Sequence, residues 1–132
     1  MLQALLSTSD DAVVVLTADP GIADADQGLV APLHEAMTRA QGISPEARTA
    51  TFVVIAGASP GHESPFTAAC VEGVRGIAQS LALEWAGRTR VNVVIAPTQA
   101  AAEPTCAWLT DQRAGFVTGS TFDLRADAWR SL

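Results

Sequence analysis

The chain has 132 residues, of which 48% are hydrophobic and 5% aromatic, and it contains no tyrosine. This length suits one domain, residues 1–132, with a core built from Ala, Val, Leu and Ile. A net charge of −6 without any basic stripe argues against nucleic acid or anionic membranes as partners. No apolar run approaches the roughly 20 residues that a membrane span needs.

The first half of the chain predicts two strands and one long helix. Residues 2–8 are typical of a short helix, and the apolar run 12–16 is typical of a strand buried on both faces. A helix is expected from about residue 26, with Gly42 ending it. A second buried strand is expected over residues 51–56.

The second half continues the alternation of helices and strands. Ser64 is a good N-cap for a helix that should run to about Trp85. A strand over 90–95, a helix around 103–111 and a last strand over roughly 116–124 follow. Such alternation predicts a single α/β layer structure with a parallel sheet and right-handed crossovers.

The two cysteines, Cys70 and Cys106, are far apart and have no metal-binding or redox spacing. Buried free thiols in a reducing cytosol are the expected state. The first residues lack the basic and long apolar segments of a signal peptide. We therefore expect a soluble, cytoplasmic protein without a metal site.

Four segments of the second half have the order and spacing of a known family's motifs. They read SPFTAAC over 64–70, GIAQSLALEW over 76–85, RVNVVIAP over 90–97, and AWL with FVTGSTFD within 107–123. Together they resemble the short-chain dehydrogenase/reductase family, clearly over 51–124 and more weakly over 1–50. The resemblance implies a truncated Rossmann-like fold of about four mostly parallel strands with flanking helices.

The chain departs from this family where the family carries its chemistry. The resemblance places the family's tyrosine at Phe66, its lysine at Cys70 and its serine near Gly57. Phe66 has no hydroxyl to exchange a proton, and Cys70 holds no fixed positive charge. Thr98 follows Pro97 where the family has glycine. We therefore expect no dehydrogenase activity from this chain alone.

The family's dinucleotide-binding half also has no counterpart in the sequence. None of its glycine-rich phosphate-binding patterns occurs in the chain, so the sequence predicts no bound cofactor. Without the first three strands of the family's sheet, residues 12–16 would form an apolar edge strand. Such an edge has to be covered.

Two helices are candidates for an oligomer interface, because the family packs the equivalents of 27–41 and 65–86 against a second subunit. Small residues on the second helix would allow close approach. The alternative is that these side chains pack only on their own sheet. The candidate interface residues are Leu33, Met37, Ala69, Gly73, Gly76 and Ile77.

The preferred interpretation is a non-catalytic subunit that forms a homo- or hetero-oligomer, preferably with a full-length, NAD(P)-dependent relative. The rival is a small-ligand binder or divergent enzyme that uses the crevice at the carboxyl ends of the strands. Its polar groups would be Ser59, Cys70 and Thr98, with Gly61 helping Ser59 to cradle a phosphate. A decayed fragment without a selected role is the third alternative.

Overall fold

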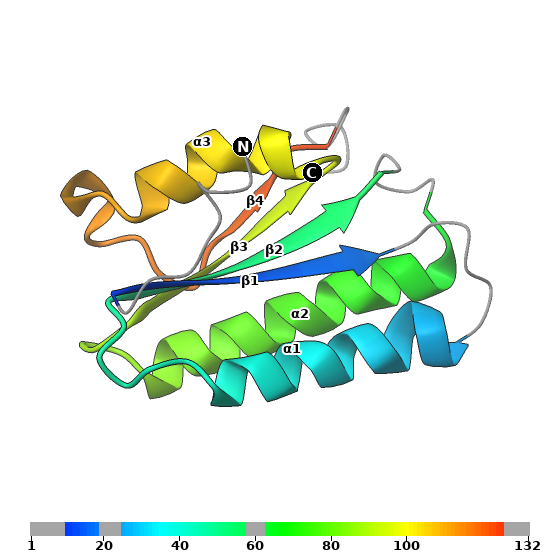
Figure 1. Ribbon diagram of the computed structural model, residues 1–132, viewed down its shortest axis with the longest axis horizontal. Helices are drawn as coiled ribbons and strands as arrows, with labels where there is room; N and C mark the ends of the chain where they lie inside the picture. The colour runs from blue at the N-terminus through cyan, green and yellow to red at the C-terminus, as the bar shows by residue number, and fades with distance from the viewer. Residues whose placement is uncertain (1–9, 19–24, 58–62, 126–132) are drawn as a thin grey trace.

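Four parallel strands form one sheet with helices on both of its faces (Figure 1). The computed structural model describes residues 10–18, 25–57 and 63–125. The strands lie in the order β1 (Asp11–Ala18), β2 (Thr49–Ala56), β3 (Arg90–Ala96) and β4 (Thr121–Asp123). The predicted α/β, Rossmann-like layer structure is confirmed.

The three long strands are mostly apolar because both faces of the sheet are covered. Alternate side chains of a strand point to opposite faces. Phe52 and Val54 of β2 therefore belong to the larger core cluster, against α1 (Ala31–Gln41) and α2 (Pro65–Glu84). Val53 between them packs on the other face, against α3 (Gln99–Leu109). This double burial explains the continuous runs of Val, Ile and Ala.

The two helices on the lower face of the sheet in Figure 1 approach each other closely at one glycine. A Cβ atom at Gly73 of α2 would lie 2.6 Å from Cδ2 of Leu33 on α1. The helix expected from residue 26 is present, although its first turn, Asp26–Val30, is a π-helix that continues into α1. Gly73 thus serves the packing of α1 on α2 within the chain.

The outer edge of β1 is partly covered by a side chain. Arg39 of α1 donates a hydrogen bond from Nη1 to the backbone oxygen of Val15, at 3.0 Å. This contact occupies a carbonyl on the side of β1 that faces away from β2. The contact partly fulfils the expectation that an apolar edge strand has to be covered.

Two element boundaries differ from the sequence prediction. Helix α3 begins at Gln99, not near residue 103, because Thr98 caps it by accepting a hydrogen bond from the N–H of Ala101 at 3.1 Å. Strand β4 is confined to Thr121–Asp123. The helix predicted over 2–8 lies outside the described residues.

Side-chain hydrogen bonds supplement backbone ones along the segment before the short β4. Asn92 donates to the oxygen of Val117 and accepts from the N–H of Ser120, each at 3.0 Å. The Thr118 hydroxyl accepts from the N–H of Val91, also at 3.0 Å. The segment before β4 therefore runs beside β3 as a loop held by both side-chain and backbone hydrogen bonds.

The expectation of uniformly right-handed crossovers is wrong for the last unit. Helices α1 and α2 pack on one face of the sheet, whereas α3 packs on the other, while the strand order continues in one direction (Figure 1). The β3–α3–β4 connection therefore has the opposite hand to the two before it. The usual preference arises from long twisted strands, and β4 has only three residues.

Candidate functional site

Phe66 and Cys70 lie on the first turns of α2, at the carboxyl end of the sheet. Their spacing of four residues places them on one helix face, and the structure buries Cys70 completely within the larger core cluster. Burial raises the pKa of the Cys70 thiol above its usual value. A buried thiol with a raised pKa is a poor nucleophile. Cys70 therefore packs in the core and is not a reactive group.

Ser64, expected as an N-cap, and Thr98, expected in the crevice, both cap helices. Ser64 Oγ accepts a hydrogen bond from the N–H of Thr67 at 3.2 Å, and Thr98 does the same for the N–H of Ala101 in α3. A hydroxyl at an N-cap satisfies a helix donor that would otherwise lack a partner. Thr98 is exposed, whereas the Cys70 side chain is buried in the larger core cluster.

The remaining crevice candidates are glycines and a serine of the loop after β2. Gly57 is exposed, and a Cβ atom added to it would meet no described atom within 4 Å. Close packing therefore does not require glycine there. Ser59 and Gly61 lie outside the described residues.

An ionic cluster at the carboxyl end of β4 was not foreseen from the sequence. Arg125, with a side chain only 6% exposed, binds both carboxylate oxygens of Asp123, at 2.9 and 2.7 Å. Its Nη1 also binds Glu63 Oε2 at 3.2 Å. The cluster joins the end of β4 to the residue before the N-cap of α2, and these segments are 62 positions apart in sequence.

The electrostatics of this cluster favour a fixed structural contact. Burial raises the pKa of Asp123, but the hydrogen bonds and charge of Arg125 outweigh it, so the pKa lies below its usual value. A carboxylate held ionised in this way is a weak proton acceptor at neutral pH. Within the described ranges, no group of three His, Cys, Asp or Glu side chains could hold a metal ion.

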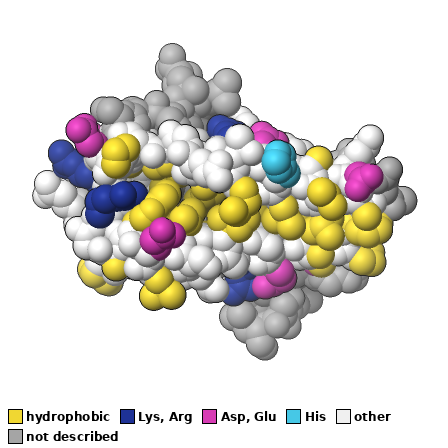
Figure 2. Space-filling view, turned by 90° about the horizontal axis from the view of Figure 1, so that it is seen from below, with side chains coloured by type: hydrophobic (Ala, Val, Ile, Leu, Met, Phe, Trp, Pro, Cys, Tyr) yellow, Lys and Arg dark blue, Asp and Glu magenta, His cyan; other side chains and the backbone are white. Residues whose placement is uncertain are grey.

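The outer face of α1 and α2 carries exposed apolar side chains. We call it the helix face and define it by Val30, Met37, Ala69, Gly76 and Leu83. Val30 and Met37 are 54% and 48% exposed, and Leu83 is 82% exposed. Figure 2 shows hydrophobic side chains gathered in a band along this side of the molecule.

Val30 and Met37 are seven residues apart on the first helical segment. The same spacing of seven separates the three helix-face residues of α2, so each set forms one stripe along its helix. Of the other interface candidates, Leu33 and Ile77 are half-buried against the core. Gly73 is occupied by its contact with Leu33. No helix in the described part of the chain is long and apolar enough to span a bilayer.

Comparison with known proteins gives a family match and many structural matches. The family described as "Short chain dehydrogenase-like protein" matches residues 23–124. No curated protein matches the sequence. Among solved structures, a short-chain dehydrogenase/reductase from Brucella melitensis superposes with a TM-score of 0.66 at 19% identity, covering 90% of this chain and 63% of its own.

Two further structures have the same fold. An oxidoreductase of the short chain dehydrogenase/reductase family from Burkholderia thailandensis gives a TM-score of 0.72 at 16% identity, covering 92% of this chain and 65% of its own. A 4-hydroxyisoleucine dehydrogenase complexed with NADH gives 0.68 at 13% identity, covering 93% and 70%. This chain thus spans less than two thirds of the first two structures.

Proposed function

Because the chain belongs to the short chain dehydrogenase-like protein family, we propose that it is a non-catalytic subunit that assembles with a full-length, NAD(P)-dependent member of that family. The observation that carries this proposal is the pair Phe66 and Cys70. They stand where the resemblance places a proton-donating tyrosine and its supporting lysine.

Neither replacement suits the family's reaction. A phenyl ring has no exchangeable proton, and a thiol with a raised pKa carries no charge at neutral pH. Cys70 is also buried in the core, where it cannot contact a ligand without a rearrangement of α2. These residues do not fit a nicotinamide site, and we assign cofactor binding and hydride transfer to the partner.

The helix face supports the assembly part of the proposal. A stripe of exposed apolar and small residues permits close helix packing. Leu83, which is 82% exposed, gains the most from being covered. The partner that we propose is the matching pair of helices on a full-length relative. Two free buried thiols also fit a reducing, cytoplasmic setting.

The assembly is tested with matched charge substitutions. Leu83→Glu places a carboxylate on the helix face, whereas Phe116→Glu does the same at a side chain that is 85% exposed and lies outside that face. In native mass spectrometry of the complex recovered from the native host, we expect Leu83→Glu to lower the oligomeric mass and Phe116→Glu to leave it unchanged. Equal effects of the two substitutions, or a monomeric wild type without a partner, would contradict the proposal.

The partner is identified by recovering tagged wild-type and Leu83→Glu chains from the native host. Co-elution of an intact family member in near-equal amount with the wild type, and its loss from the variant, supports the mixed complex. The isolated chain is then assayed for NAD(P)H oxidation with a panel of carbonyl compounds. Turnover by the isolated chain overturns the non-catalytic assignment, and a pure homo-oligomer overturns the mixed one.

A further inference from the structure

Three arginine side chains surround one hollow at the amino ends of the strands, the opposite end from Ser64 and Thr98. The hollow has a volume of about 370 Å³, and Arg48, Arg88 and Arg90 contribute to its lining. They come from the residue before β2, the turn after α2 and the start of β3. Among the residues that the structure describes, no aspartate or glutamate lines this hollow.

These arginines differ from the others in having no carboxylate partner. Every other arginine in the described part of the chain forms an ion pair: Arg39 with Glu35, Arg75 with Glu72, Arg113 with Asp111, and Arg125 with Asp123 and Glu63. Arg48, Arg88 and Arg90 form none with any described residue. In a chain of net charge −6, the described arginines without a carboxylate partner are thus gathered at one place.

Two of the three guanidinium groups are held by neutral partners. Arg90 donates from Nη1 to the backbone oxygen of Ala114 at 2.6 Å. The Arg88 guanidinium lies 4.7 Å from the centroid of the Trp85 ring and donates from Nε to the Thr89 hydroxyl at 3.2 Å. Such contacts orient a cation without neutralising it. The remaining N–H groups can still bind an anion.

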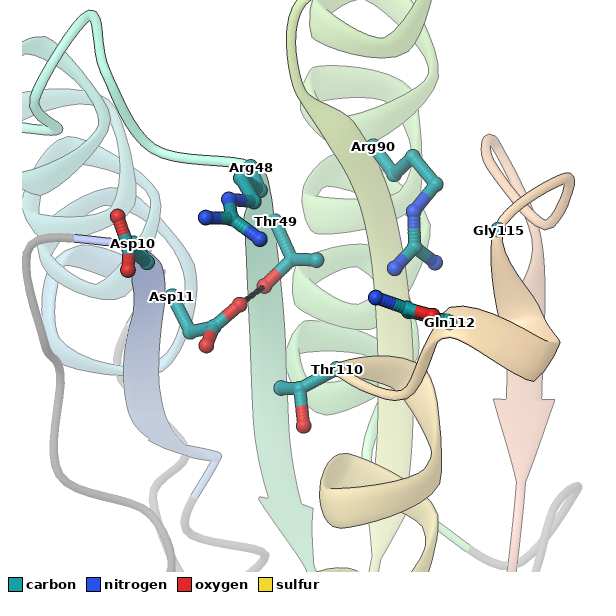
Figure 3. Close-up of a pocket in the computed structure, with 8 residues that line it drawn as sticks. All are labelled: Asp10, Asp11, Arg48, Thr49, Arg90, Thr110, Gln112 and Gly115. Atoms are coloured by element: carbon teal, nitrogen blue, oxygen red, sulfur yellow. Dashed lines mark hydrogen bonds between the residues drawn. The ribbon is translucent and has the colours of Figure 1, made fainter.

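A second hollow of about 270 Å³ continues from the first and shares Arg48 and Arg90. Figure 3 shows both guanidinium groups turned towards this hollow, with the Gln112 amide beside Arg90 and with Asp10 and Asp11 on the β1 side. Asp11 accepts a hydrogen bond from the Thr49 hydroxyl at 2.7 Å. Among the described residues, Asp10 and Asp11 line this second hollow and not the first, and they share it with Arg48 and Arg90.

The balance of charge at the arginine hollow favours an anion. Its three full positive charges outweigh about half a negative charge at the carboxyl end of α2, and the nearest described carboxylates, Asp10 and Asp11, line the adjoining hollow. Guanidinium groups match the geometry of phosphate oxygens and bind them through paired hydrogen bonds. The volume lies within the range of roughly 300–1,000 Å³ found for small-molecule sites.

We propose that this hollow binds a small molecule through a phosphate group, held by Arg48, Arg88 and Arg90. The site is separate from the crevice at the carboxyl ends of the strands and from the helix face. It gives the chain a ligand-binding role that does not depend on assembly with a catalytic partner.

The test is a calorimetric titration of the full chain with inorganic phosphate and pyrophosphate, in a buffer free of other multivalent anions. Pyrophosphate should bind with an affinity that falls as NaCl is raised. Arg48→Gln and Arg88→Gln should each weaken binding about tenfold. Both side chains are exposed, so neither change threatens the fold.

Arg113→Gln is the matched control, because it removes the same charge from an exposed arginine that is paired with Asp111. It should change the affinity by less than about twofold. Three results overturn the proposal: no binding at millimolar ligand, equal weakening by all three substitutions, or binding of heparin or RNA without binding of pyrophosphate. The last result assigns the arginines to a polyanion.

Discussion

At the scale of single residues, the two cysteines show how burial sets chemistry. Cys70 and Cys106 are both free and buried, and burial raises the pKa of Cys106 to about 11. The thiolate is the reactive form. At pH 8, a thiol with this pKa is ionised to only about one part in a thousand. Both residues therefore act as small hydrophobic side chains.

We predict that neither thiol reacts rapidly with a disulfide reagent in the folded protein at pH 8, whereas both react once urea unfolds the chain. The measurement is the absorbance of the released aromatic thiolate over time. Cys70→Ala serves as the control that assigns the signal, because it should remove one of the two equivalents. Rapid reaction of the folded wild type would show that one thiol is accessible.

A second residue-scale prediction concerns Asp123, whose pKa is lowered in the fold by Arg125 despite the opposing effect of burial. A lowered folded-state pKa stabilises the protein above the unfolded value of about 3.9. This contribution is lost as the pH falls through the lower folded value. The free energy of unfolding should therefore decrease between about pH 5 and pH 3.

The measurement is urea denaturation at stepped pH. Asp123→Asn should flatten the decrease, while Glu84→Gln, at an exposed residue of α2, should leave the slope close to that of the wild type. Asp123→Asn should also cost roughly 1–3 kcal/mol at neutral pH, because it weakens the pairing of a nearly buried Arg125. An unchanged pH slope in this variant would show that Asp123 does not carry the effect.

At the scale of elements, two glycines of α2 occupy different surroundings. A Cβ atom on Gly73 would overlap the Leu33 side chain, whereas one on Gly76 would meet no described atom within 4 Å. Replacing glycine by alanine inside a helix gains about 1 kcal/mol where there is room. Overpacking at a close contact costs about 1–3 kcal/mol.

We therefore predict that Gly76→Ala stabilises the chain and that Gly73→Ala does not. Urea denaturation, repeated at several protein concentrations, measures both on the same helix. Combining Gly73→Ala with Leu33→Ala should give a smaller loss than the sum of the two single changes, because the two residues share one contact. Additive losses would mean that α1 and α2 do not meet at this point.

The motif RVN at the start of β3 is part of the family resemblance, but the resemblance does not reveal which residues the motif contacts. In the sequence it is part of a family pattern. In the structure, Asn92 and the N–H of Val91 bind the segment 117–120. Arg90 reaches the oxygen of Ala114. These contacts fasten the loop before β4 to the sheet.

At the scale of the whole molecule, apolar runs and cap residues predicted the parallel α/β fold. The runs 12–16 and 51–56 fall inside β1 and β2, and Ser64 caps α2 as expected. The sequence did not predict the start of α3, because its cap Thr98 precedes a run of alanines and a proline within the helix. It also could not predict the reversed hand of the last crossover.

The sites were harder to predict than the fold, because their members are distant in sequence. Glu63 and Arg125 meet only when β4 lies beside β3. The arginine hollow brings Arg48 close to Arg88 and Arg90. The net negative charge of the chain gave no indication of this local group of positive charges. The expected burial of Cys70 is confirmed, whereas Ser59 and Gly61 lie outside the described residues.

The two core clusters differ in size, and this leads to a prediction about local opening. The cluster under α1 and α2 spans β1, β2 and β3, while the cluster under α3 is smaller. Strand β4 adds only three half-buried residues. Regions with few buried contacts open first. Hydrogen exchange followed by mass spectrometry should show faster exchange in β4 than in Phe52–Val54, and equal protection would contradict this.

The hydrogen bond from Arg39 to the Val15 oxygen also affects how copies of this chain meet each other. An open strand edge is a template on which further strands can add, which leads to fibres or swapped dimers. A guanidinium group on that edge has to be displaced, and its charge desolvated, before another strand can pair there. The Arg39 side chain thus opposes extension of the sheet beyond β1 by a second copy of the chain.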